Sequence, residues 1–183
     1  MEKFTFEKVT SEKKEDIIEY ILEFYKYNSR INGVGRLQDF INNEKNEFEV
    51  WFEKIKNEEK NKEIPKICYL CIRKNDNKLI GMANIRMTKN LHDYPYGNVG
   101  YSIRPTERNK GYGKVQFYLA LKEMKKNEID ICQMNCEKNN EESKKIIKSF
   151  GGKFEYSIEN QEYYLIDVKE SIQNNFQKYE KLL

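Results

Sequence analysis

The sequence predicts an α/β (α+β) fold in which a central sheet carries helices on both faces. In several segments, among them the opening one, apolar and polar residues alternate as they do in half-buried strands. Other segments repeat apolar residues at helical spacing. The two kinds of segment alternate along 183 residues without an internal repeat or a break in composition. We therefore expect one domain spanning residues 1–183.

The N-terminal third is predicted to hold one strand and three helices. Phe4–Val9 alternates apolar and polar residues, as a half-buried strand does. Ser11 is expected to cap a first helix that breaks near Asn32-Gly33. A second helical stretch is expected over Leu37–Lys45. The third helix is marked by the apolar residues Phe48, Trp51, Phe52 and Ile55.

The remaining chain is predicted to hold six strands and three helices. Turn-forming residues separate the first two strands, which indicates a hairpin. The expected strands are Ile67–Arg73, Leu79–Met87, Asn98–Arg104, Ile129–Cys136, Lys153–Ile158 and Glu162–Val168. The expected helices are Gly111–Asn127, Asn140–Ser149 and Glu170–Leu183, the last with the apolar stripe Ile172, Phe176 and Tyr179 packed on the core.

Composition argues against several classes of protein. The chain holds 33 Lys and Arg against 30 Asp and Glu, a net charge of +3 with the signs interspersed, which argues against nucleic-acid binding. No apolar run is long enough to span a membrane, and Met1–Phe4 lacks a signal-peptide core, so a cytoplasmic location is expected. Cys68 and Cys71 fall on opposite faces of a predicted strand, and no second Cys or His pair accompanies them. We therefore expect no metal site.

Residues 98–114 join a strand to a helix through a short polar loop. Pro105 ends the strand, and Gly111 and Gly113 permit close backbone approach. The free N–H groups of the helix N-terminus attract anions, and positive charge is added there by Arg108, Lys110 and Lys114. This pattern predicts a phosphate or pyrophosphate site, but it fits neither a nucleoside-triphosphate loop nor a dinucleotide fold. The alternative is a helix N-terminus with glycines for packing.

Two segments carry a resemblance to a known family. Val99–Lys114 resembles the acyl-CoA-binding motif of the GNAT acetyltransferase superfamily, [Gln/Arg]-x-x-Gly-x-[Gly/Ala] after a strand. Cys136–Ser143, followed by Phe150-Gly151-Gly152, is similar to the family's second motif. The resemblance covers residues 66–168. It implies a mixed, mostly antiparallel sheet of about seven strands, with a V-shaped splay between the fourth and fifth strands opened by a bulge near Gly100–Tyr101.

The resemblance implies an N-acetyltransferase that moves an acetyl group from acetyl-CoA to a primary amine of a small molecule or peptide. The backbone of Tyr101–Ile103 would pair with the pantetheine arm, and an N–H there would polarise the thioester carbonyl. Asn140 would contact the arm, although it also fits a simple helix cap. The cofactor-binding residues implied are Tyr101, Ser102, Ile103, Arg108, Asn109, Lys110, Gly111, Tyr112, Gly113, Lys114, Asn140 and Ser143.

Two positions depart from the family pattern. Asn98 stands where many relatives place a Glu or His base, and Ile147 where many place a Tyr that protonates the leaving thiolate. Tyr101 and Glu137 are therefore the candidate catalytic residues. Further candidates are Tyr163, Tyr164 and the single histidine, His92. A non-catalytic acyl-CoA-binding regulatory module on the same fold is the alternative function.

The sequence is compatible with more than one acceptor and more than one oligomeric state. The protein is expected to be a monomer or a homodimer. Residues 28–55 and the loop 88–97 would wall the acceptor site. An acidic acceptor would be bound by Arg30, Arg36 and Arg86, and a basic one by Glu44, Glu47 and Glu49.

Overall fold

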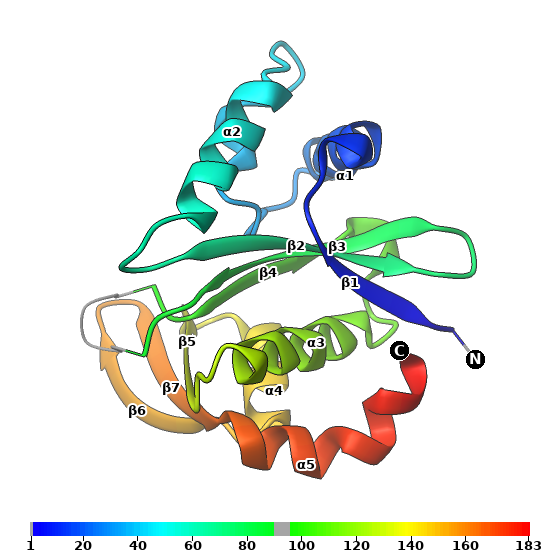
Figure 1. Ribbon diagram of the computed structural model, residues 1–183. Helices are drawn as coiled ribbons and strands as arrows, with labels where there is room; N and C mark the ends of the chain where they lie inside the picture. Colours follow the sequence, from blue (N-terminus) through cyan, green and yellow to red (C-terminus); the bar gives the residue numbers. More distant parts are fainter. Residues whose placement is uncertain (1, 90–95) are drawn as a thin grey trace.

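The computed structural model describes residues 2–89 and 96–183, and these residues form two antiparallel sheets (Figure 1). The first sheet has the order β1-β2-β3-β4 and the second the order β5-β7-β6. The strands of the first are β1 (Phe4–Lys8), β2 (Lys66–Arg73), β3 (Lys78–Arg86) and β4 (Val99–Ile103). Those of the second are β5 (Ile131–Glu137), β6 (Lys153–Ile158) and β7 (Gln161–Asp167). The sheets part between β4 and β5, which confirms the predicted splay between the fourth and fifth strands.

Helices cover both faces of the first sheet, which confirms the predicted layering (Figure 1). On one face lie α1 (Lys14–Lys26) and α2 (Phe48–Glu59). On the other side lie α3 (Tyr112–Lys126), α4 (Glu141–Ser149) and α5 (Val168–Tyr179). Within the described residues, no helix combines the length and the apolar character needed to cross a membrane.

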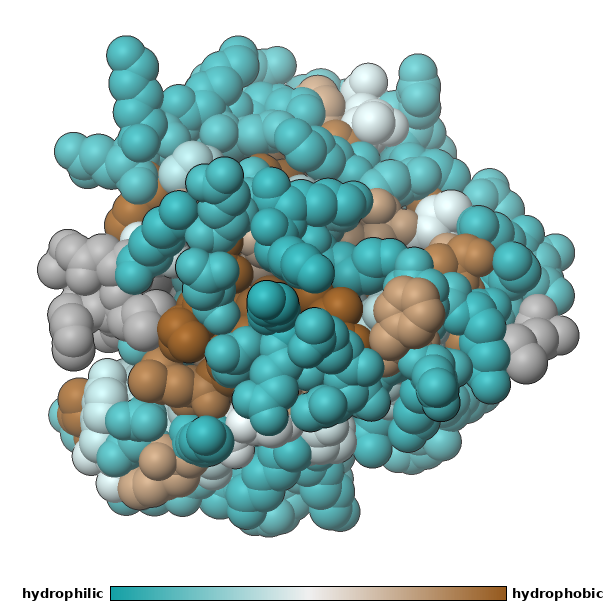
Figure 2. Space-filling view, turned by 60° about the horizontal axis from the view of Figure 1, so that its bottom comes forward, coloured by the Kyte–Doolittle hydropathy of each residue, from teal (hydrophilic) through white to brown (hydrophobic). Residues whose placement is uncertain are grey.

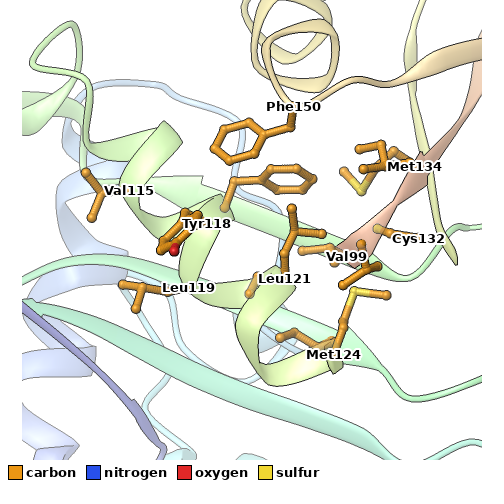
Figure 3. Packing of buried hydrophobic residues seen from close by; sticks show 14 of the residues in the cluster. Val99, Val115, Tyr118, Leu119, Leu121, Met124, Cys132, Met134 and Phe150 are labelled. Atoms are coloured by element: carbon orange, nitrogen blue, oxygen red, sulfur yellow. The ribbon is translucent and has the colours of Figure 1, made fainter. Parts of the chain in front are cut away.

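Each face of the first sheet buries its own apolar core. One core joins α1 and α2 to the sheet, with Trp51 and Cys68 among its members. The other joins α3 to both sheets and includes Cys71. The two cysteines therefore lie on opposite faces of β2, as predicted. In Figure 3, side chains of β4 and β5, including Val99 and Met134, gather against α3 and close the bottom of the splay with apolar groups.

The helix expected over Leu37–Lys45 is wrong. Only the 3-10 turn Leu37–Asp39 forms there, and Ile41 pairs with Asn46 across a tight turn. The Asn42 side chain explains the change, because its Oδ1 accepts the backbone N–H of Glu44 at 2.8 Å. Such a local side-chain bond stabilises a turn in competition with a helix.

Two smaller expectations also need correction. Ser11 makes no capping hydrogen bond, and the chain forms a 3-10 turn there before α1 begins at Lys14. On α5, Ile172 and Tyr179 are buried as expected, but the side chain of Phe176 is 53% exposed. The face of the molecule seen in Figure 2 is mainly hydrophilic, with hydrophobic residues exposed in patches.

Candidate active site

The buried Asn98 side chain holds the closed end of the splay together. The Asn98 N–H donates to Gln133 O at 2.7 Å, and Asn98 Oδ1 accepts the Gln133 N–H at 2.7 Å. Its Nδ2 donates to Arg86 O at 3.1 Å and to Thr88 O at 3.0 Å. A side-chain amide therefore stands between β4 and β5 where a backbone carbonyl would sit in a regular ladder. From Val99 onward, β4 and β5 belong to different sheets.

The expected bulge near Gly100–Tyr101 is absent from the β3–β4 ladder. The register runs without a shift from Ile103 opposite Gly81 to Val99 opposite Ile85. The Asn98 amide, bonded to Gln133 and to Arg86 O and Thr88 O, lies where β4 and β5 part.

The free edge of β4 presents the backbone of Tyr101 to the splay. Arg104 N donates to Ile80 O and Arg86 N to Asn98 O, so even-numbered residues of β4 bond to β3 and odd-numbered ones face β5. The N–H and C=O of Tyr101 consequently point into the splay, where no other described residue bonds them. Ser102 does not join this group, because its Oγ donates to Asn32 O at 2.6 Å on the α1 side.

The loop before α3 forms a row of unpaired backbone donors. None of the N–H groups of residues 109–113 donates to another described residue, whereas Lys114 N donates to Gly111 O. Gly111 has a φ of +84°, and a Cβ there would meet nothing within 4 Å. Asn109 is also left-handed, with a φ of 64°. Five successive free N–H groups at a helix N-terminus make an anion cradle of the kind that binds pyrophosphate.

Most cationic or polar side chains of this loop are engaged outside the cradle. Lys110 Nζ donates to Glu107 Oε2 at 2.8 Å. Tyr112 is buried, and its hydroxyl donates to Glu2 Oε2 at 2.6 Å. Arg108 donates from Nε to Ile103 O at 3.1 Å and from Nη2 to Ser29 Oγ at 2.8 Å. The cradle is thus built from backbone, with Lys114 half-buried beside it.

Glu107 anchors the cradle loop from beneath. Its side chain is 5% exposed and accepts hydrogen bonds from Arg73, Lys78 and Lys110. Burial alone would raise the pKa of this carboxyl, but the three cationic donors outweigh burial and lower its pKa to about 2. The charged carboxylate fixes the loop through three ion pairs.

The start of α4 lies beside Tyr101 of β4. Asn140 caps this helix, because its Oδ1 accepts the Ser143 N–H at 3.1 Å. Ser143 Oγ lies 3.5 Å from the Tyr101 hydroxyl. A Cβ on Gly113 would lie 3.0 Å from Ile146 Cδ1, so α3 and α4 approach closely here. The structure therefore places Tyr101 of β4 and Gly113 of α3 against the first half of α4, which Asn140 caps and to which Ser143 belongs.

The candidate catalytic residues differ in what they can do. Burial raises the pKa of the Tyr101 hydroxyl to about 12, so it stays protonated and can donate a proton. Both carboxylate oxygens of Glu137 accept from Arg30 Nη1, at 2.8 and 2.9 Å. Ile147 is fully buried in the core. His92 lies outside the described residues.

The remaining candidates bond to or stack on other groups, or are exposed. The Tyr164 hydroxyl donates to Glu162 at 2.7 Å, and the Tyr163 ring stacks on Tyr156. Arg36 pairs with Asp39, and Arg86 donates to Gly97 O at 3.0 Å. The acidic set Glu44, Glu47 and Glu49 is exposed. Among the described residues, no group of three or more His, Cys, Asp and Glu side chains could hold a metal ion.

Sequence reasoning missed the part played by the segment after α1. Gly33 has a φ of +70°, and a Cβ there would lie 2.3 Å from Gly100 O and 2.4 Å from Tyr101 Cα. The backbone of Gly33 thus rests directly on β4 beside the splay. The Asn-Gly pair signalled a turn, but only the structure shows what the glycine touches.

A comparison with models of protein families identifies the family of this chain. Residues 5–153 match the model of the acetyltransferase (GNAT) domain. The chain belongs to the GNAT acetyltransferase family. A GNAT domain implies acyltransferase activity in general. No sequence match was found among curated proteins.

Solved GNAT structures share the fold at low sequence identity. Apo FdhC, described as a nucleotide-linked sugar GNAT, has a TM-score of 0.70 and 16% identity, over 99% of this chain and 95% of that one. The ribosomal-protein-S5-alanine acetyltransferase of Vibrio fischeri has a TM-score of 0.65 and 17% identity, over 90% and 92%. The putative acetyltransferase yncA of Salmonella typhimurium, solved with its cofactor acetyl-CoA, has a TM-score of 0.58 and 12% identity, over 90% and 94%.

Proposed function

We propose that this GNAT protein transfers an acetyl group from acetyl-CoA to the amine of a small molecule or peptide. The observation that carries the proposal is the row of five free N–H groups at residues 109–113, at the mouth of a splay whose β4 edge is unpaired. The cradle suits the pyrophosphate of the cofactor. The free N–H and C=O of Tyr101 suit an extended amide-bearing arm, which would add to β4 as a further strand.

The chemistry then follows from the groups around the channel. The acceptor nitrogen attacks the thioester carbonyl carbon, and a backbone N–H of the splay stabilises the oxyanion. As the C–N bond replaces the C–S bond, the departing thiolate takes a proton from the Tyr101 hydroxyl. That hydroxyl is protonated at neutral pH because its pKa lies near 12. The amine loses its proton to water, and the tyrosinate is reprotonated from solvent.

Two glycines provide a matched test of the cradle. Gly111 and Gly151 have φ angles of +84° and +80°, and a Cβ on either would meet nothing within 4 Å. Alanine at either position therefore adds the same left-handed strain, about 1 kcal/mol. Only Gly111 lies in the cradle, so Gly111→Ala tilts the N–H groups and fills the space in front of them.

Titration calorimetry with acetyl-CoA reads the difference. Gly111→Ala is expected to weaken binding roughly tenfold, the value of about one charge-assisted hydrogen bond, while Gly151→Ala leaves affinity unchanged. Equal affinity in both variants, or no binding by the wild-type chain, would show that residues 109–113 do not hold the cofactor.

The commitment of Asn98 to structural bonds supports a second candidate function, a module that binds acyl-CoA without transferring the acyl group. The Asn98 amide is fully engaged, and no histidine lies within the described residues. This candidate predicts acetyl-CoA binding without thiol release over a broad panel of amines. Release of CoA with any amine of the panel excludes it.

A further inference from the structure

The segment between α1 and the Leu37–Asp39 turn contacts both sides of the splay, the loop after β4 and the end of β5. Ser29 Oγ accepts from Arg108, which belongs to the cradle loop that follows β4, at 2.8 Å. The next residue, Arg30, donates through Nη1 to both oxygens of Glu137 at the end of β5, at 2.8 and 2.9 Å. Two consecutive residues thus bind the opposite walls of the splay. We call residues 28–33 the strap, and the Arg30–Glu137 ion pair its clasp.

The C-terminal half of the strap is fixed to β4. The O of Asn32 accepts from Ser102 Oγ at 2.6 Å, and the backbone of Gly33 lies against Gly100 and Tyr101. These contacts lie on the α1 side of the sheet, because the Tyr20 side chain of α1 also bonds to Ser102 O, at 3.0 Å. On the other side of the sheet lie α3 and α4. The strap therefore crosses the splay on the face away from these two helices.

We propose that Arg30 and Glu137 are positioning residues whose ion pair closes the splay over the pantetheine arm. This proposal rests on the proposed function. The arm enters from the α3 and α4 side, and the clasped strap forms the opposite wall of its channel.

The clasp gives Glu137 a structural partner. Each of its two carboxylate oxygens accepts a hydrogen bond from Arg30 Nη1, at 2.8 and 2.9 Å. The Arg30 side chain is 83% exposed and that of Glu137 is 30% exposed. An ion pair this exposed is weak, so the clasp can open when cofactor enters or leaves.

Charge reversal tests the clasp without relying on a single variant. The variants are Arg30→Glu, Glu137→Arg and the double exchange, measured as acetyl-CoA dissociation rates from the immobilised full chain by surface plasmon resonance. Each single reversal is expected to raise koff roughly threefold to fivefold, as an exposed pair allows. The double exchange is expected to return koff to within about twofold of wild type. The control is Arg36→Glu, because Arg36 pairs only locally with Asp39, and koff should not change.

Hydrogen exchange of the free protein supplies a readout that needs no cofactor. The amides of residues 28–33 should exchange faster in each single reversal and recover in the double exchange. Unchanged koff and unchanged exchange in the single reversals would overturn the proposal. So would a Glu137→Gln variant that abolishes acetyl transfer at unaltered koff, since this outcome makes Glu137 a base. Failure of wild type to bind acetyl-CoA would refute the proposed function instead, and hydrogen exchange would still decide whether the clasp holds the strap.

Discussion

Replacing Asn98 by aspartate tests whether its amide holds the splay. The variant keeps an oxygen for the Gln133 N–H but loses both donors, to Arg86 O and Thr88 O. Each of these two carbonyls loses the amide as a donor, and a carboxylate oxygen faces them at about 3 Å. With about 1 kcal/mol for each lost bond and a further penalty for a buried charge beside carbonyl oxygens, the free energy of unfolding should fall by about 3–5 kcal/mol at pH 7.

Urea unfolding measures the change, and Asn135→Asp is the matched control. Within the described residues, the half-buried Asn135 side chain makes one hydrogen bond, to Gln161 Oε1 at 3.1 Å, so the control should lose about 1 kcal/mol or less. In Asn98→Asp, burial beside carbonyl oxygens raises the pKa of the introduced carboxyl, and its protonated form regains one donor. The deficit of Asn98→Asp should therefore shrink as pH falls through that raised pKa. A deficit below about 1 kcal/mol at pH 7, or one that grows in acid, would refute the role given to the amide.

Three further substitutions test the strap, the loop before α3 and the Tyr101 hydroxyl. Gly33→Ala should lower the free energy of unfolding, measured in urea, by about 2–4 kcal/mol, because its Cβ would lie 2.3 Å from Gly100 O. The control is Gly100→Ala, whose Cβ would lie 3.4 Å from Gly33 Cα, and it should lose less than about 1 kcal/mol. Glu107→Gln should lower the free energy of unfolding by about 2–3 kcal/mol at pH 7. Because the pKa of Glu107 in the folded protein is lowered to about 2, this difference should vanish as pH falls from about 4.5 towards 2. A difference that persists at pH 2 contradicts the ion-pair account. Tyr101→Phe should lower kcat for thiol release roughly a hundredfold with little change in the KM for acetyl-CoA, whereas a raised KM at constant kcat would make Tyr101 a binding group instead of an acid.

Most of the fold could be predicted because its signals are local. Alternation, apolar runs and turn-forming residues located the seven described strands, and the offset of Cys68 and Cys71 placed them on opposite faces. The helix expected over Leu37–Lys45 failed because one Asn42 side-chain bond outweighed a weak periodicity. Periodicity counts apolar positions and does not weigh a polar side chain against the backbone.

The candidate site also combines features that local sequence predicts with contacts that it does not predict. The free N–H groups of residues 109–113 follow from a glycine loop that opens a helix, and the Asn140 cap follows from local spacing. The clasp joins Arg30 to Glu137 across 107 positions, and no local pattern in the sequence pairs them. Only the folded geometry shows that Arg108 reaches the strap through its side chain.

The position of Asn98 relates the shape of the splay to its chemistry. The side chain there must accept one backbone N–H and donate to two carbonyls, and an amide is the group that supplies one acceptor and two donors together. A carboxylate has no donor, and a neutral imidazole has one acceptor but only one donor. An amide whose acceptor and both donors are engaged in these bonds does not act as a base. Under the proposed function, acetyl transfer would depend on positioning a reactive thioester and on the proton held by Tyr101, with solvent taking the proton of the amine. Asn98→His, which restores an imidazole at this position, should accordingly disrupt the splay and lower acetyl transfer, and faster transfer in that variant would show that the position can serve chemistry as well as structure.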